Sequence, residues 1–299
     1  MKKSVLILLL LCVLLPTFSI AQERWKRQRY EFSFGVGITN FLGELGGANQ
    51  IGTNYFKDLE WSRSGLAVAV GLRYKLNNYF ALKSHLTYGH VSGNDNLTEE
   101  VFRSDRNLSF FSDIYEFNVN LEAAFQQEKI GHRYKLKNVR GVFGYEIYTY
   151  AFVGMGLFHM DPKAEYNGSV VRLQPLGTEG QGVVPSRTKY SLYQFCIPLG
   201  IGFKYTIERN WGVGLELGIR KTFTDYIDDV STTYFDFNSY PGLYDPDAPK
   251  LADRSKGTIL GATNPGAQRG DNRESDTYMF AVFSINYKLN SSGRFLPRF

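Results

Sequence analysis

The chain has 299 residues, of which 43% are hydrophobic and 15% aromatic, and its formal net charge is +5. No internal run reaches the ~18 apolar residues that a membrane-spanning helix needs, which argues against a helical membrane protein. A mean hydropathy of -0.26 is still compatible with a membrane β-barrel, because its strands alternate apolar and polar residues.

The N-terminus predicts a secretion signal peptide over residues 1–21. Lys2 and Lys3 form its charged start, residues 5–15 its apolar core, and Ser19-Ile20-Ala21 a small-x-small cleavage site. The apolar core is too short to span a membrane. Residues 22–29 then predict a basic periplasmic tether.

Of the two cysteines, one lies in the predicted leader and the other in the mature chain. Cys12 lies in the apolar core of the leader, without the small residues that precede a lipidated cysteine, so a lipoprotein is not expected. The mature chain keeps Cys196 alone and therefore cannot form an intramolecular disulfide. We expect Cys196 to be a small residue that faces a barrel interior.

The strand pattern is clearest in residues 64–91, which predict a long hairpin. Apolar side chains occupy the even positions on both sides of Asn77-Asn78-Tyr79. Directly paired residues share a face of a sheet, so the loop must hold an odd number of residues. We predict a three-residue turn with an asparagine in a left-handed conformation.

The rest of the chain repeats this alternation. The expected strands are residues 30–41, 64–76, 80–91, 110–125, 145–160, 190–207, 211–224 and 276–289. Gly154 and Gly156 lie where curvature or a close backbone approach is expected. Residues 208–210 predict a second three-residue turn, whereas 92–109, 161–189 and 225–275 predict long loops. Residues 290–299 form a C-terminal tail.

Eight strands with alternating short and long connections predict an all-β fold. Its architecture is an eight-stranded antiparallel up-and-down transmembrane β-barrel over residues 30–289, in the outer membrane of a Gram-negative bacterium. Short turns of such barrels face the periplasm and long loops face outward. Both termini are therefore expected in the periplasm. Outer-membrane lipid and lipopolysaccharide are the expected surroundings, and no nucleic-acid partner is expected.

The predicted interior carries charges of both signs. An eight-stranded barrel is just wide enough for side chains to fill it, so we expect a packed ion-pair network that closes the pore. Its expected members are Arg73, Lys83, Glu116, Glu122, Glu216 and Arg220, with His85 among them.

Few residues suggest chemistry, and no enzyme, metal site or cofactor is predicted. His159 and Asp161 form a His-x-Asp pair at the end of the fifth strand, and they alone keep a hydrolase open as a third hypothesis. Asp225, Asp228 and Asp229 could bind a divalent cation, although a solvated acidic loop is the favoured interpretation.

The connection 126–144 is strongly basic and lies at the predicted periplasmic end. Its cations could bind anionic lipid headgroups or an acidic partner protein. Because lipid anchoring alone does not require an insertion, we favour a protein partner. The candidate contact residues are Arg133, Lys135, Lys137 and Arg140.

Four stretches resemble the PorG-like family of outer-membrane barrels associated with the type IX secretion system. They are NFLGELGGAN at 40–49, RNLSF at 106–110, IPLGIGFKY at 197–205 and LGIRKTFTDYIDDV at 217–230. Glu44 stands where the family often has Asp. The resemblance implies a non-enzymatic barrel that anchors or assembles the periplasmic ring of the secretion system, with periplasmic lipoproteins as partners. The alternative is a stand-alone surface-binding or membrane-integrity barrel of the OmpA/OmpX type that acts through its outer loops.

Overall fold

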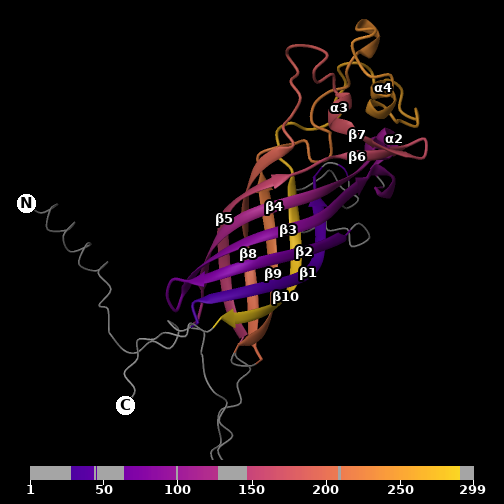
Figure 1. Cartoon of the computed structure of the whole chain (residues 1–299). Helices are drawn as coiled ribbons and strands as arrows, with labels where there is room; N and C mark the ends of the chain where they lie inside the picture. Colours follow the sequence, from indigo (N-terminus) through magenta and orange to yellow (C-terminus); the bar gives the residue numbers. More distant parts are fainter. Residues whose placement is uncertain are drawn as a thin grey trace, which may run out of the picture.

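The computed structural model describes residues 28–43, 45, 64–98, 100–126, 147–207 and 210–289. Within them, eight long strands form a closed antiparallel barrel (Figure 1). These strands are β1 (Tyr30–Leu42), β2 (Gly65–Lys75), β3 (Phe80–Asn94), β4 (Ser109–Ala124), β5 (Ile147–His159), β8 (Tyr193–Thr206), β9 (Trp211–Thr222) and β10 (Thr277–Leu289). Each pairs with the next one in this order, and β1 pairs with β10 to close the ring. The predicted eight-stranded barrel is therefore confirmed.

The two faces of every strand follow the period-two pattern of the sequence. In β1, Phe32, Phe34 and Val36 are exposed on the outside, whereas Glu31 and Ser33 are buried inside. Alternate residues of a strand point to opposite faces, so the apolar set forms the outer wall and the polar set fills the interior. Among the described residues, no helix is long and apolar enough to cross a membrane.

The turn between β2 and β3 has the predicted length but a different internal geometry. The register pairs Lys75 with Ala81, and the Leu76 amide donates to the Phe80 carbonyl, which leaves three residues in the turn. The predicted left-handed asparagine is wrong, because Asn107, Asn167 and Asp229 are the described non-glycine residues with positive φ. Instead, the Asn77 side-chain oxygen accepts from the amides of Tyr79 and Phe80, each at 2.8 Å. A side-chain acceptor thus organises this turn.

The second predicted turn falls partly outside the described residues, which omit Glu208 and Arg209. The flanking pair agrees with it, since the Ile207 amide donates to the Trp211 carbonyl at 3.0 Å. In β5, a Cβ atom on Gly154 would lie 2.3 Å from the Val119 carbonyl oxygen of β4. The close backbone approach expected at this glycine is therefore present.

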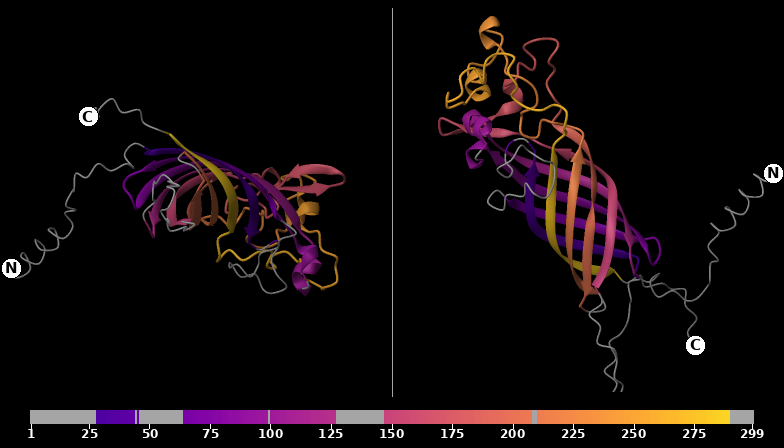
Figure 2. Two further views of the ribbon diagram at one scale, coloured as in Figure 1. Left: turned by 90° about the horizontal axis from the view of Figure 1, so that it is seen from below. Right: turned by 180° about the vertical axis from the view of Figure 1, so that it is seen from behind.

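The long connections at one end of the barrel are folded, where the sequence predicted loops. They carry β6 (Lys163–Tyr166), β7 (Ser169–Arg172), η4 (Asp95–Leu97), α2 (Val101–Arg106), α3 (Leu173–Leu176), η5 (Phe237–Ser239) and α4 (Ala248–Ala252). These elements gather beyond the same end of the strands, where Figure 2 shows them as one body above the barrel wall. We call the described residues of 95–108, 160–192 and 223–276 the cap.

One apolar cluster joins the cap to the barrel. From the strands it includes Phe158, Cys196 and Phe280, and from the cap it includes Ile227 and Leu251, all buried. Cys196 is buried in the interior as predicted. Because burial of apolar side chains stabilises both partners, the cap and the upper barrel form a common core.

Candidate functional site

The charged interior is arranged in three tiers along the barrel, which we name by their distance from the cap. In the distal tier, Arg73 Nε lies 2.5 Å from Glu122 Oε2, and Lys204 Nζ donates to both carboxylate oxygens of Glu31 at 2.6 and 2.7 Å. Arg73 also lies 3.7 Å from Glu31 and donates to the Tyr148 hydroxyl at 2.7 Å. These five side chains therefore form one connected group.

The middle tier is centred on Glu216. Lys83 Nζ donates to Glu216 Oε2 at 2.6 Å, and His85 Nε2 lies 3.6 Å from the same oxygen. All three side chains are almost completely withdrawn from solvent.

The proximal tier is centred on Glu116. Arg220 Nε lies 3.3 Å from both carboxylate oxygens, and the Tyr278 hydroxyl donates to Glu116 Oε2 at 2.7 Å. The Asn118 amide also donates to Glu116, and the Arg220 guanidinium lies 4.5 Å above the Phe280 ring. Buried charges of this kind are tolerated when they are paired and hydrogen-bonded.

The structure thus places each predicted interior charge opposite another of the set. The pairs are Arg73 with Glu122, Lys83 with Glu216 and Arg220 with Glu116. Glu31 and Lys204 also belong to this network, and the sequence predictions did not include them, although both have the interior parity of their strands.

The predicted periplasmic contact residues Arg133, Lys135, Lys137 and Arg140 lie outside the described residues, as do the leader 1–21, most of the tether and the tail 290–299. At the described end far from the cap, Arg29 donates to the Tyr74 hydroxyl at 3.0 Å, and Lys75 and Lys288 are buried.

The His159–Asp161 pair is not formed. His159 faces outward and packs its ring 4.8 Å from Tyr193, whereas Asp161 accepts from Arg172 Nε at 2.9 Å. The peptide after β5 carries Asp161 towards the β6–β7 hairpin, so the shared face expected for two strand residues is lost. The hydrolase hypothesis rested on this pair alone and therefore loses its support.

The predicted solvated acidic loop is also wrong. Asp228 and Asp229 are buried, and Asp228 accepts from the amides of Leu45 and Val230. Among the described residues, no group of three or more His, Cys, Asp or Glu side chains could hold a metal ion. These aspartates bind protein groups instead.

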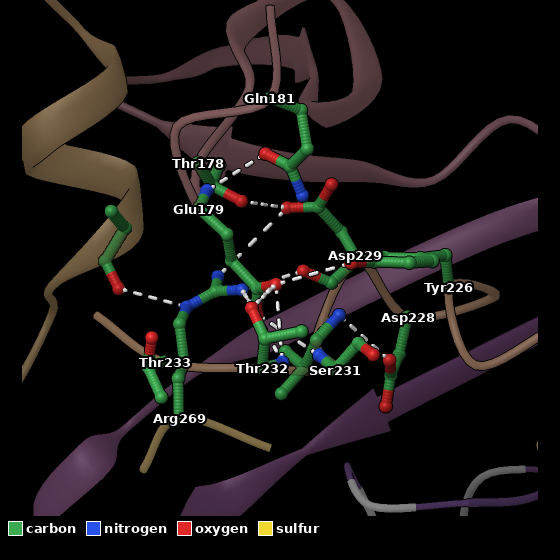
Figure 3. Close-up of polar contacts among 12 residues, drawn as sticks. Thr178, Glu179, Gln181, Tyr226, Asp228, Asp229, Ser231, Thr232, Thr233 and Arg269 are labelled. Atoms are coloured by element: carbon green, nitrogen blue, oxygen red, sulfur yellow. Dashed lines mark hydrogen bonds and ion pairs between the residues drawn. The ribbon is translucent and has the colours of Figure 1, made fainter. Parts of the chain in front are cut away.

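The cap has its own buried ionic centre, formed by Glu179, Arg269 and Asp229 (Figure 3). Glu179 accepts from Arg269 Nη1 at 2.9 Å, from the amides of Ser231 and Thr232, and from the Thr232 hydroxyl at 2.6 Å. Its side chain and that of Arg269 are almost inaccessible to solvent. A carboxylate with this many donors is well satisfied in the charged form.

Arg269 and Asp229 extend this centre to the remaining segments of the cap. Arg269 donates to the carbonyls of Ala252 and Asp229 at 3.2 and 2.6 Å. The Asp229 carboxylate accepts from the hydroxyls of Thr178 and Tyr190 at 2.5 and 2.6 Å. Three sequence-distant segments therefore meet at one arginine. No local motif of the sequence signals this meeting.

Burial changes the acidity of groups in this centre. Desolvation raises the pKa of Asp229 to about 6, against the opposing influence of Arg269, Thr178 and Tyr190. Desolvation together with the neighbouring Asp229 raises the pKa of the Tyr190 phenol well above its usual value.

The cap also has an open pocket of about 840 Å³. Its lining includes Phe102 and Arg103 of α2, and Gln268, Gly270 and Asp271. The pocket lies next to the ionic centre, which contributes Arg269 to its wall.

Comparison with known proteins identifies the family. A family model described as "Outer membrane protein beta-barrel domain" matches residues 7–239. The chain belongs to this family. Membership of this family places the chain in the outer membrane.

Similar solved structures are also outer-membrane proteins, at low identity. Ail of Yersinia pestis, solved with the heparin analogue sucrose octasulfate, is 7% identical with a TM-score of 0.38, and the match covers 88% of this chain and 99% of Ail. The N-terminal barrel of Pseudomonas aeruginosa OprF is 10% identical with a TM-score of 0.33, over 87% and 98% of the two chains. The outer membrane enzyme PagL is 13% identical with a TM-score of 0.29, over 87% and 99%. A search of curated proteins found no match.

Proposed function

We propose that this chain is a closed, non-enzymatic outer-membrane barrel that acts at the cell surface through its cap. The observation that carries the proposal is the buried Glu179–Arg269–Asp229 centre, which holds the long connections in one defined arrangement. Binding surfaces gain affinity when they are ordered before binding. The long loops of bacterial barrels face outward, so the cap would lie outside and both termini in the periplasm.

Closure of the pore is part of this proposal. The three ion-pair tiers cross the interior, where small barrels have room for side chains only. In the distal and middle tiers the paired charges are almost completely buried. This supports a role as a scaffold rather than a channel.

The first test asks whether the cap lies on the outer side of the membrane. Leu260 is fully exposed on the cap, whereas Cys196 is buried. A Leu260→Cys variant on intact cells should react with a membrane-impermeant maleimide, and the unchanged chain should not. Labelling only after the outer membrane is permeabilised would contradict the proposed orientation.

A second candidate function is anchoring or assembly of the periplasmic ring of a type IX secretion system. It is supported by the sequence resemblance and by the basic composition of residues 126–144. Reversing the charges of Arg133, Lys135 and Lys137 should then abolish recovery of periplasmic lipoproteins in a gentle detergent pull-down.

A matched variant separates the two functions. Replacing residues 225–275 by a short Gly-Ser linker removes much of the cap but leaves the basic connection intact. Under the surface-binding function this variant should lose the cellular phenotype of the protein while partner recovery is unaffected. Under the anchor function, the charge-reversed chain should lose partner recovery, and the chain without residues 225–275 should keep it.

A further inference from the structure

The inner face of β4 carries a row of polar side chains that runs between two of the tiers. They occupy alternate positions of the strand, point into the barrel and are buried: Glu116, Asn118, Asn120 and Glu122. The Asn118 amide donates to Glu116, and Asn120 Nδ2 donates to Asn118 Oδ1 at 3.0 Å. The row therefore starts in the proximal tier and extends towards Glu122 in the distal tier.

The hydrogen bonds of this row run in one direction. The Glu116 carboxylate accepts from Arg220 and Tyr278, so the neighbouring Asn118 must turn its NH2 group towards this acceptor. Asn118 then offers its side-chain oxygen to the NH2 group of Asn120, whose own oxygen is left over. Exchanging oxygen and nitrogen in either amide would bring two acceptors into contact, so the network determines the orientation of both.

The row ends in two buried acceptor atoms that lack a donor. In the described part of the chain, no hydrogen-bond donor reaches Asn120 Oδ1 or Glu122 Oε1, whereas the other Glu122 oxygen accepts from Arg73. Asn120 is 2% exposed and Glu122 is 1% exposed, so bulk solvent does not reach these atoms. Buried polar atoms of folded proteins are nearly always hydrogen-bonded to protein or to ordered water, so a donor is expected here.

The surroundings of the two oxygens select a neutral donor. Lys83 pairs with Asn120 across the strands, and the Arg73 guanidinium binds the Glu122 carboxylate. These two cations would repel another cation, and the acceptor oxygens would repel an anion. Gly154 pairs with Asn120 from β5, where a side chain would collide with Asn120 Oδ1. The glycine therefore makes room for this oxygen on the side of β5.

We propose that one ordered water molecule lies between Asn120 and Glu122 and donates a hydrogen bond to the open oxygen of each. Residues two apart on a strand are separated by roughly 6.6 Å along it, a spacing that two side chains and one molecule with two donors can span. Buried waters typically make about three hydrogen bonds to protein groups, and Lys83 is the nearest donor in register for the third. The water joins the proximal and distal tiers into one hydrogen-bonded network along β4.

The test is a crystal structure of the full mature chain at a resolution that shows ordered waters. The wild type should show a density peak about 2.7–3.2 Å from both Asn120 Oδ1 and Glu122 Oε1. The peak should be lost in Asn120→Met, because methionine removes one acceptor and its longer side chain fills the site. Asn286→Met is the matched control, since Asn286 is a buried interior asparagine of β10 whose side-chain oxygen accepts from Ser284. It should keep the peak. Retention of the compact, heat-sensitive gel band shows that each variant is folded.

Several outcomes would overturn the inference. They include a wild type without a peak between the two oxygens, and a peak that persists in the folded Asn120→Met variant. In crystals grown with rubidium chloride, an anomalous signal at this position would assign the site to a monovalent cation. An infrared band of a protonated carboxyl group that disappears in Glu122→Gln would show that a proton on Glu122 supplies the missing donor. The site lies inside the barrel, so these measurements are independent of the orientation of the cap.

Discussion

Arg269 is the cation of the buried Glu179–Arg269–Asp229 centre of the cap. It compensates Glu179 and donates to the carbonyls of Ala252 and Asp229. Removing one partner of a buried ion pair leaves an uncompensated charge, which costs about 3–5 kcal/mol. An Arg269→Met variant should therefore open the cap more often than the wild type.

Cap opening can be measured through Cys196, which is buried in the cluster shared by cap and barrel. The rate of thiol labelling, mapped by mass spectrometry, should rise strongly in Arg269→Met. Lys250→Met is the control, because its ion pair with Asp247 is exposed to solvent and exposed pairs contribute little to stability. Equal labelling rates in both variants would show that the ionic centre does not hold the cap.

Asp229 should make the stability of the cap depend on pH. Its pKa in the folded protein is about 6, against an ordinary value of 3.8 for an aspartate, so the folded state binds more protons between these two values. The free energy of unfolding must then fall as pH rises from about 4 to 6, by on the order of 2–3 kcal/mol for this shift.

The measurement compares wild type with Asp229→Asn at each pH, which cancels the intrinsic pH dependence of thiol labelling. Asparagine keeps a hydrogen-bonding side chain and tolerates the positive φ of 66° at this position. The ratio of the Cys196 labelling rates, wild type over variant, should rise from pH 4 to pH 6. A flat ratio would contradict the raised pKa.

At the scale of elements, the β2–β3 turn depends on one side chain. Asn77 accepts from two backbone amides, whereas Asn78 makes no hydrogen bond within the described part of the chain. Asn77→Ala should lower the free energy of unfolding by about 1 kcal/mol, and Asn78→Ala should have a smaller effect. Urea unfolding in lipid vesicles, followed by tryptophan fluorescence, checks the difference. If Asn78→Ala is the more damaging change, the side-chain acceptor is not what stabilises the turn.

Strands and turns differ in how far sequence predicts them. Parity at Arg73, Lys83 and Glu216 predicts interior positions because a strand has only two faces. The length of the β2–β3 turn follows from the same parity. The conformation of Asn77 does not, because a left-handed residue and a side-chain acceptor both close three-residue turns.

The cap could not be predicted from sequence for a different reason. Asp228 and Asp229 belong to an acidic stretch that suggests solvent exposure, and their burial depends on donors at Leu45, Thr178 and Tyr190. These donors come from other connections, so no local spacing signals them. His159 and Asp161 do not form a pair, because β5 ends at His159 and Asp161 lies beyond the strand.

At the scale of the whole molecule, the interior tiers rather than the cap should close the barrel. In planar lipid bilayers the wild type should insert without steady unitary conductance. The variant that replaces residues 225–275 by a linker should also stay closed, because Arg73, Lys83 and Arg220 with their acidic partners remain. Steady conductance in the shortened variant alone would assign closure to the cap, and conductance in both would contradict a filled interior.

The pairing of β1 with β10 has a consequence for how the protein is made. Thirteen residue pairs, from Tyr30 with Leu289 to Leu42 with Thr277, join the first strand to the last. Until β10 has been synthesised and exported, β1 has an unpaired edge, and exposed strand edges promote aggregation. We therefore expect the protein to be prone to aggregation until export of β10 is complete. A chain truncated before Thr277 should not close into a barrel, because β1 and β9 would both lack the partner that β10 supplies.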